Sequence, residues 1–299
     1  MKIAVFTKNR TNPAYQAARL GADRAAAWLG AKTVHYVPET GDDPDEQSAL
    51  VDRALAEAPD AFVFTPVHAT KVDAAIARIV AAGIPIAGFV NPVPNAPCVT
   101  YVGSDDTRLA LEAAQTLFRH LHGRGEVLVV SGPIDSVTSV ERVHAFLDAA
   151  ELRPGIVLKG TVVGDYRRDV ARDRTAHWLA GHGRVDGVLA ANDIMAIGVV
   201  DALKVAGQRA AIVGVNAIPE AIDAIKRGEM LATADFNAMR MAFLATECAI
   251  RHLHGEIVPA HVDLPVAIVD RHNCSSWDLP YAERPIPTLE ETLACMPAG

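Results

Sequence analysis

The stretch LAANDIMAIG at residues 189–198 passes from the end of an apolar run directly into a helical pattern. Three other stretches also lie at the end of a predicted strand or in the helix that follows it: TNPAY (11–15), VERVHAF (140–146) and VGVN (213–216). In open parallel α/β sheets, ligands bind at the carboxyl ends of the strands. These four stretches therefore predict both the fold class and the edge at which a ligand binds.

Short apolar runs alternate with alanine-rich amphipathic segments on both sides of these stretches. The first series predicts strands at 2–7, 33–37, 61–65 and 84–89, and helices at 13–30, 44–57 and 70–82. The second predicts strands at 126–132, 157–163, 187–191, 211–216 and 231–235, and helices at 137–150, 167–182, 193–206 and 219–227. This alternation is typical of βαβ units with parallel sheets covered by helices on both faces. Two similar series predict two doubly wound lobes rather than one barrel.

A helix at 238–254 and the run VDLPVAIVD (262–270) remain after the second series is complete. We expect the helix to return to the first lobe. This predicts one lobe from residues 1–103 and 236–264 and another from residues 104–235 and 265–275. Residues 276–299 are expected to form an extended tail with a helical turn near 288–295. Several crossings between lobes favour a hinge over a free linker.

Composition excludes several classes of protein. The formal net charge of −8 argues against a nucleic-acid partner, and no run of about 18 apolar residues predicts a membrane span. The sequence has no CxxC pair; Cys274 and Cys295 could pair in an oxidising compartment or remain free. The histidine pairs His120/His122 and His252/His254 lie on predicted helices, where residues two apart point to opposite faces and cannot chelate one metal ion. No metal and no cofactor are expected. No signal peptide is visible, which fits either a mature exported protein or a cytoplasmic one.

Taken together, the motifs resemble the type I periplasmic binding proteins, specifically the ribose/galactose/xylose-type solute-binding proteins of ABC transporters. LacI-type effector domains share that fold. The resemblance spans residues 2–270 and rests on NP followed by Tyr15, the ER pair at 141–142, NDxMAxG and VGVN. It implies a periplasmic, monomeric binder without enzymatic activity. Such a protein closes around one small solute between its lobes and delivers it to a membrane permease.

The resemblance also implies the residues that contact the ligand. Those of the first lobe are Asn12, Tyr15, Val90 and Asn91, and those of the second are Arg142, Tyr166, Asn192 and Asn216. Phe236 is a further contact, at the hinge. Aromatic rings can stack on the C–H face of a sugar or polyol, and amides supply paired donors and acceptors for hydroxyl groups. Lys8, Arg10 and His68 are further candidates for the rim of the site.

Some positions depart from the family pattern. Val90-Asn91 stands where pentose binders commonly have Asp-Arg, Asn216 replaces an aspartate, and Phe236 replaces a glutamine. Two acceptors for sugar hydroxyls are thus missing, which favours a polyol or a modified, less hydroxylated sugar. A buried Arg142 needs a counter-charge, for which Asp165 and Asp235 are the nearest candidates in sequence. If neither reaches it, the ligand is expected to bring a carboxylate or carbonyl oxygen.

Plainer structural roles remain open for most of these residues. Asn12 could serve only as a helix cap, the two tyrosines could be ordinary half-buried rings, and Phe236 could be wall packing. Asp193 is expected to cap the helix that follows Asn192. Arg142 could form a surface pair with Glu141, while Lys8 and Arg10 could be solvated and His68 a loop residue.

Two other function classes also remain. A sugar isomerase or aldolase would need a positioned acid/base pair, whereas the predicted contacts are mostly amides and aromatics. The sequence contains none of the GxGxxG, GxxxxGK[ST] and GxSxG motifs. The effector domain of a LacI-like regulator normally follows a helix-turn-helix segment, and none precedes the first strand here.

Overall fold

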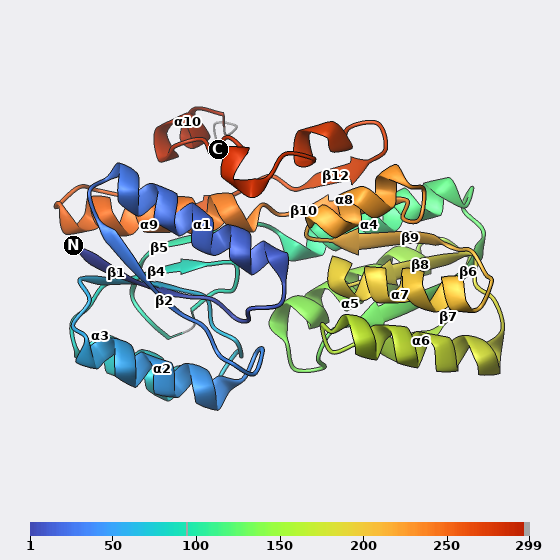
Figure 1. The fold of residues 1–299 in the computed structure, drawn as a ribbon, viewed down its shortest axis with the longest axis horizontal. Helices are drawn as coiled ribbons and strands as arrows, with labels where there is room; N and C mark the ends of the chain where they lie inside the picture. Colours follow the sequence, from blue (N-terminus) through green and yellow to red (C-terminus); the bar gives the residue numbers. More distant parts are fainter. Residues whose placement is uncertain (94, 296–299) are drawn as a thin grey trace. The chain divides into compact units, whose positions relative to one another are not determined.

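The computed structural model describes residues 1–93 and 95–295 of the chain. They form two α/β units (Figure 1). Unit 1 contains residues 1–104 and 237–264 and the residues from Tyr281 onward; unit 2 contains residues 105–236 and 265–280. The expected tail at 276–299 is thus divided between the units at Pro280, and residues 296–299 lie outside the described part.

Unit 1 is built on a parallel sheet with the strand order β11-β5-β4-β3-β1-β2. Its strands are β1 (Lys2–Phe6), β2 (Lys32–Tyr36), β3 (Ala61–Phe64), β4 (Ile86–Phe89), β5 (Cys98–Gly103) and β11 (His261–Asp263). Its helices are α1 (Pro13–Trp28), α2 (Pro44–Ala56), α3 (Asp73–Ala81), α9 (Ala238–Leu253) and α10 (Leu289–Ala294), with a 3-10 turn η2 (Tyr281–Glu283).

Helices cover both faces of this sheet, with α1 and α9 on one side and α2 and α3 on the other (Figure 1). Between the sheet and the α2/α3 layer lies a core in which the ring of Phe6 stacks on Tyr36, with 4.9 Å between centroids. Gly21 lies where α1 crosses α9, and a Cβ at this position would collide with the Met239 carbonyl. Close packing on both faces explains why the inner strands β3 (AFVF) and β4 (IAGF) are apolar and fully buried, whereas the edge strands β2 (KTVHY) and β11 (HVD) carry polar residues.

Unit 2 repeats the plan with the strand order β12-β10-β9-β8-β6-β7. Its strands are β6 (Gly125–Ser131), β7 (Ile156–Val163), β8 (Gly187–Ala190), β9 (Ala211–Val215), β10 (Ala232–Asp235) and β12 (Ala267–Asp270). Its helices are α4 (Asp106–His120), α5 (Val137–Glu151), α6 (Arg168–His182), α7 (Asp193–Val205) and α8 (Pro219–Lys226), with a 3-10 turn η1 (Cys274–Trp277).

The predicted fold class is confirmed: both units are doubly wound α/β sheets with the same strand order. In each sheet the order reverses beside the first strand, between β1 and β3 in unit 1 and between β6 and β8 in unit 2. Loops diverge at such a reversal, and ligands of open α/β sheets bind in the opening this creates. The candidate residues are therefore those in the loops that follow these strands.

Two details differ from the sequence predictions. Strand β12 runs antiparallel to β10, an arrangement common for the edge strand of a large parallel sheet. The run at 262–270 supplies β11 and β12 on either side of Leu264 and Pro265, where the expected boundary between the lobes also falls. Helix α3 begins at Asp73 rather than near residue 70, because the N–H groups of Thr70 and Lys71 donate to His68 Nδ1 instead.

The described residues contain no helix that is long and apolar enough to cross a membrane. Cys98, Cys248, Cys274 and Cys295 are free thiols. Burial raises the pKa of Cys98 to about 11 and that of Cys248 to about 12, so these two remain thiols at neutral pH.

Candidate functional site

The residues singled out in the sequence lie at or just beyond the carboxyl edges of the two sheets. In unit 1, Lys8, Arg10, Asn12 and Tyr15 follow β1, His68 follows β3, and Val90 and Asn91 follow β4. In unit 2, Arg142 lies in α5 after β6, and Tyr166, Asn192, Asn216 and Phe236 follow β7, β8, β9 and β10. We describe them as two half-sites, one in each unit.

Three of the predicted contact residues at these strand exits have a strained backbone. Val90 has a φ of 63°, Tyr166 a φ of 55° and Asn216 a φ of 123°. A positive φ is unfavourable for residues other than glycine, and for a β-branched residue such as valine it is a clear outlier. Strained conformations persist only where the surroundings impose them, and they cluster at functional sites. The strain thus coincides with three of the predicted contact residues, of which Asn216 also lies in a motif, VGVN.

Asn91 presents a buried acceptor in the unit 1 half-site. Its Nδ2 donates to the Pro66 carbonyl at 2.9 Å, which fixes the orientation of the carboxamide. Its Oδ1 is buried and has no hydrogen-bond partner among residues 1–93 and 95–295. A buried acceptor without a partner is costly, so a donor is expected to reach this oxygen when the site is filled.

Asn12 is a helix cap, as its sequence context predicts. Its Oδ1 accepts from the Ala14 N–H at 3.0 Å at the start of α1, and Pro13 occupies the first turn. The oxygen is therefore used within the helix terminus, and the amide nitrogen is the group that can serve a ligand. Tyr15 lies in the same turn and is 8% exposed.

The rim candidates of unit 1 are engaged within the unit. Lys8 is not solvated, because it is only 1% exposed and its Nζ lies 3.0 Å from Asp42 Oδ1. Arg10 is an exposed residue that pairs with Glu39 at 3.0 Å. His68 Nδ1 accepts from two backbone N–H groups, which gives the imidazole a role in the loop after β3.

Arg142 has a counter-charge that the sequence did not reveal. Its Nε donates to Asp106 Oδ1 at 2.6 Å, and the two side chains are only 4% and 9% exposed. Its NH1 group donates to the Ala191 carbonyl at 2.8 Å, and the Phe236 ring centroid lies 5.4 Å from its guanidinium carbon. The guanidinium is thus held between the start of α4, the end of β8 and an aromatic face.

The ion pair that the structure shows for Arg142 is with Asp106, which was not among the two candidates nearest in sequence. Asp165 pairs with Arg174 at 3.0 Å, and Asp235 accepts from the Trp277 indole at 2.7 Å. A surface pair with Glu141 is also not what the structure shows for this buried arginine. Burial and the nearby Asp106 raise the pKa of Glu141. Since Asp106 already neutralises Arg142, the ligand does not have to bring an acidic group.

Tyr166 is anchored by its hydroxyl group. Its Oη lies 3.0 Å from Thr138 Oγ1, at the start of α5, and 3.5 Å from Ser136 Oγ. Its ring lies against Gly132, where any Cβ would collide with it. The glycine after β6 thus makes room for the aromatic side chain that the sequence assigns to the site.

Asn192, rather than Asp193, caps α7. Asn192 Oδ1 accepts from the Met195 N–H at 2.9 Å, so the predicted cap was one residue out. Asp193 turns inward and is completely buried, and this burial raises its pKa to about 7. Gly198, which ends the NDIMAIG stretch, lies where α7 approaches α6, because a Cβ there would collide with the Arg168 carbonyl.

Asn216 gives unit 2 an acceptor like that of Asn91. Its backbone N–H donates to the Ala234 carbonyl at 2.8 Å. Its Oδ1 is buried and unpartnered within the part of the chain that the structure describes. Each half-site therefore offers one amide oxygen that lacks a donor.

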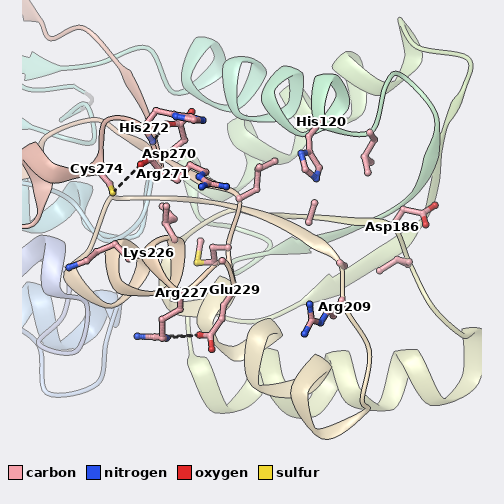
Figure 2. Close-up of a pocket in the computed structure, with 18 of the residues that line it drawn as sticks. His120, Asp186, Arg209, Lys226, Arg227, Glu229, Asp270, Arg271, His272 and Cys274 are labelled. Atoms are coloured by element: carbon pink, nitrogen blue, oxygen red, sulfur yellow. Dashed lines mark hydrogen bonds and ion pairs between the residues drawn. The ribbon is translucent and has the colours of Figure 1, made fainter.

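An open groove of about 1010 Å³ lies at the opposite, amino-terminal edge of the unit 2 sheet (Figure 2). Its lining includes residues that precede β8, β9 and β10, and none of the predicted contact residues. Several of its charged side chains are already paired, such as Arg227 with Glu229 at 3.0 Å and Lys226 with Asp278 at 2.8 Å. The described residues also contain no cluster of three or more side chains suited to hold a metal ion.

Comparisons with known proteins agree with this arrangement. Residues 3–257 match the family model described as "Periplasmic binding protein domain". The ribose import binding protein of Bacillus subtilis is 24% identical over 89% of this chain and 85% of its own length. The xylitol-binding protein of Mycolicibacterium smegmatis is 26% identical over 64% of this chain, but the match spans only 56% of that protein.

Solved structures give the same result. A solute-binding protein from Mycobacterium smegmatis with bound glycerol has a TM-score of 0.85 and 26% identity, covering 92% of this chain and 96% of the other. One from Actinobacillus succinogenes with bound D-allose has a TM-score of 0.85 and 25% identity, covering 91% and 98%. The chain belongs to the periplasmic binding proteins, in the type I group of sugar-binding proteins of ABC transporters.

Proposed function

We propose that this protein captures a small, uncharged polyol or a less hydroxylated sugar in the periplasm and delivers it, as a monomer, to the permease of an ABC importer. Asn12, Tyr15, Val90 and Asn91 of unit 1 contact the solute, as do Arg142, Tyr166, Asn192, Asn216 and Phe236 of unit 2. A solute that binds to both half-sites stabilises the conformation in which both half-sites contact it. This population shift is the signal to the permease.

One observation carries the proposal: Oδ1 of Asn91 and Oδ1 of Asn216 are buried acceptors without donors among the described residues. A hydroxyl group is the donor that supplies one hydrogen bond to each oxygen without bringing charge. Two such oxygens suit a solute with several hydroxyl groups. A neutral amide oxygen forms a weaker hydrogen bond with a hydroxyl group than a carboxylate does. Amides at these positions therefore suit a ligand that is held by fewer or weaker hydrogen bonds than a pentose.

Charge complementarity argues for a neutral solute. Arg142 is paired with Asp106, and Lys8 is paired with Asp42. Neither cation therefore needs an acidic ligand, and a sugar acid would add an uncompensated negative charge to a buried site. Among the candidate solutes, sugar acids are therefore disfavoured, and polyols and neutral sugars remain.

The relatives support two candidates within that class. The xylitol-binding protein and the glycerol-bound structure favour an acyclic polyol. The ribose import binding protein, matched over a larger share of both chains, favours a ring pentose as the second candidate. The missing carboxylates at positions 90 and 216 make the polyol the first choice.

Isothermal titration calorimetry of the purified chain with xylitol, glycerol, D-ribose, D-allose and D-gluconate tests the proposal. We expect xylitol or another polyol to bind most tightly, and mass spectrometry to recover it unchanged. Binding of D-ribose alone would support the second candidate. Binding of D-gluconate alone, or conversion of any compound to a product, would contradict the proposed function.

A further inference from the structure

A buried hydrogen-bond network joins the NDxMAxG stretch to the loop that carries Asn216. Asp193 Oδ1 accepts from the Thr233 hydroxyl at 2.7 Å, and Asp193 Oδ2 accepts from the Ile218 N–H at 3.1 Å. Thr233 Oγ1 in turn accepts from the Ala217 N–H at 3.2 Å. Asp193 and Thr233 are both completely buried, and their direct hydrogen bonds connect α7, β10 and the β9–α8 loop.

The loop needs this support because its backbone is strained. Asn216 and Ala217 follow each other with φ values of 123° and 50°. Two consecutive residues in this unfavourable region persist only if their surroundings impose the conformation. The N–H groups of Ala217 and Ile218 are the ones bound by Thr233 and Asp193.

Gly214 explains how the carboxylate reaches this position. A Cβ on Gly214 would collide with Asp193 Oδ1, so the side chain of Asp193 occupies the space that a side chain of β9 would fill. The buried position of Asp193 in NDxMAxG therefore depends on the glycine in VGVN.

The network tolerates either protonation state of Asp193. Burial, together with the charge of Asp235, raises the pKa of Asp193 to about 7. The Thr233 hydroxyl can donate to the carboxylate or accept from the protonated acid, while Ile218 N–H donates to the other oxygen in both states. The shape of the acceptor pair, rather than its charge, holds the loop.

We infer that Asp193 and Thr233 are positioning residues that hold Asn216 in the conformation in which its carboxamide meets the solute. The inference rests on the proposed function, which assigns Asn216 to the solute. Neither residue contacts the solute itself; both act through the backbone of residues 217 and 218.

Two substitutions at Thr233 separate positioning from general stability. Thr233→Val keeps the shape but removes the hydroxyl, whereas Thr233→Ser keeps the hydroxyl. Thr175→Val is the matched control, because Thr175 is a buried threonine of α6 whose hydroxyl has no partner among the described residues. Should Thr233→Val not fold, Asp193→Leu and Asp193→Asn provide the same comparison, since the carboxamide oxygen of asparagine can accept from the Ile218 N–H while its nitrogen donates to Thr233 Oγ1.

Amide hydrogen exchange of the ligand-free protein and xylitol affinity are measured for each variant. We expect Thr233→Val to accelerate exchange at Ala217 and Ile218 at least about ten-fold while the β9 amides stay protected. Xylitol affinity should fall by about ten-fold, and Thr233→Ser should restore both quantities.

Unchanged exchange at Ala217 and Ile218, or equal losses in Thr233→Val and Thr175→Val, would overturn the inference. Accelerated exchange with unchanged xylitol affinity would overturn it as well, because Asn216 would then not depend on the loop. If the unmodified protein binds none of the neutral compounds, the proposed function fails, and the exchange data still decide whether the two residues hold the loop.

Discussion

Arg142 Nε lies 2.6 Å from Asp106 Oδ1, and this ion pair is buried within a single unit. It joins the first turn of α4 to the middle of α5. Under the proposed function, it also neutralises the Arg142 guanidinium, which would otherwise favour an acidic solute. The pair therefore has two consequences, one for stability and one for ligand class.

The stability consequence is a large cost for removing one partner. We expect Asp106→Ala to lower the free energy of unfolding by about 3–5 kcal/mol, because the buried Arg142 would lose the carboxylate to which its Nε donates. Asp201→Ala is the control, since its pair with Arg168 has side chains 29% and 48% exposed and should contribute less than about 1 kcal/mol. Urea denaturation followed by circular dichroism measures both. Equal decreases in the free energy of unfolding for the two variants would show that the buried pair contributes no more to stability than an exposed one.

The side chain at position 216 should control the choice between polyol and sugar. Asn216→Asp replaces a neutral acceptor with a charged one, which forms stronger hydrogen bonds with hydroxyl groups. We expect the ratio of D-ribose affinity to xylitol affinity to rise about ten-fold in calorimetry. Gln208→Glu changes another buried amide oxygen that lacks a partner among the described residues, and should leave the ratio unchanged. A ratio that moves equally in both variants would point to a general charge effect.

Gly214 should not tolerate a methyl group. In Gly214→Ala the new Cβ would displace the Asp193 carboxylate, and overpacking of this kind costs about 1–3 kcal/mol. Gly181→Ala provides the contrast, because a Cβ on this residue of α6 meets nothing within 4 Å, and alanine favours the helix by about 1 kcal/mol. Thermal unfolding is expected to shift in opposite directions for the two variants. Shifts of the same sign would contradict the close contact.

Asp193 should make stability depend on pH in the opposite sense to a paired surface carboxylate. Its pKa is about 7 in the folded protein and near 3.8 for an ordinary aspartate in an unfolded chain, so the folded state holds the extra proton between these values. Its contribution to the free energy of unfolding is complete below pH 4 and is lost as the pH rises to 7, by up to about 1.4 kcal/mol per pH unit. Asp193→Asn lacks this titration. Its stability relative to the unmodified protein should therefore rise from pH 4 to pH 7 in urea denaturation, and a flat difference would contradict the raised pKa.

The sequence predicted local features well and long-range partners poorly. The alternation of apolar strands and amphipathic helices predicted the doubly wound fold, and Asn12 before Pro13 predicted the start of α1. These features depend on neighbours within one or two turns of chain. The counter-charge of Arg142 lies 36 residues away at Asp106, and that of Lys8 lies in the loop before α2 at Asp42. No periodicity links such positions, because they meet only when the sheet is assembled.

The exchange of roles between Asn192 and Asp193 shows the same limit on a shorter scale. Both side chains can cap a helix, and adjacent positions give no reason to prefer either. The choice is made by Gly214, whose missing side chain leaves a space that accepts the Asp193 carboxylate. Asn192 then takes the cap because Asp193 is used elsewhere.

The way the β9–α8 loop is anchored bears on how easily this protein could change its solute. The main-chain N–H groups of residues 216, 217 and 218 are bound to Ala234, Thr233 and Asp193, so the Asn216 side chain supports none of the loop. Asn91 differs, because its carboxamide also ties its own loop to Pro66. A substitution at position 216 thus leaves these backbone hydrogen bonds in place, provided that the new residue accepts the φ of 123°, whereas a substitution at position 91 removes the hydrogen bond to Pro66. Under the proposed function, new solute specificities, whether evolved or engineered into biosensors, should therefore start from position 216.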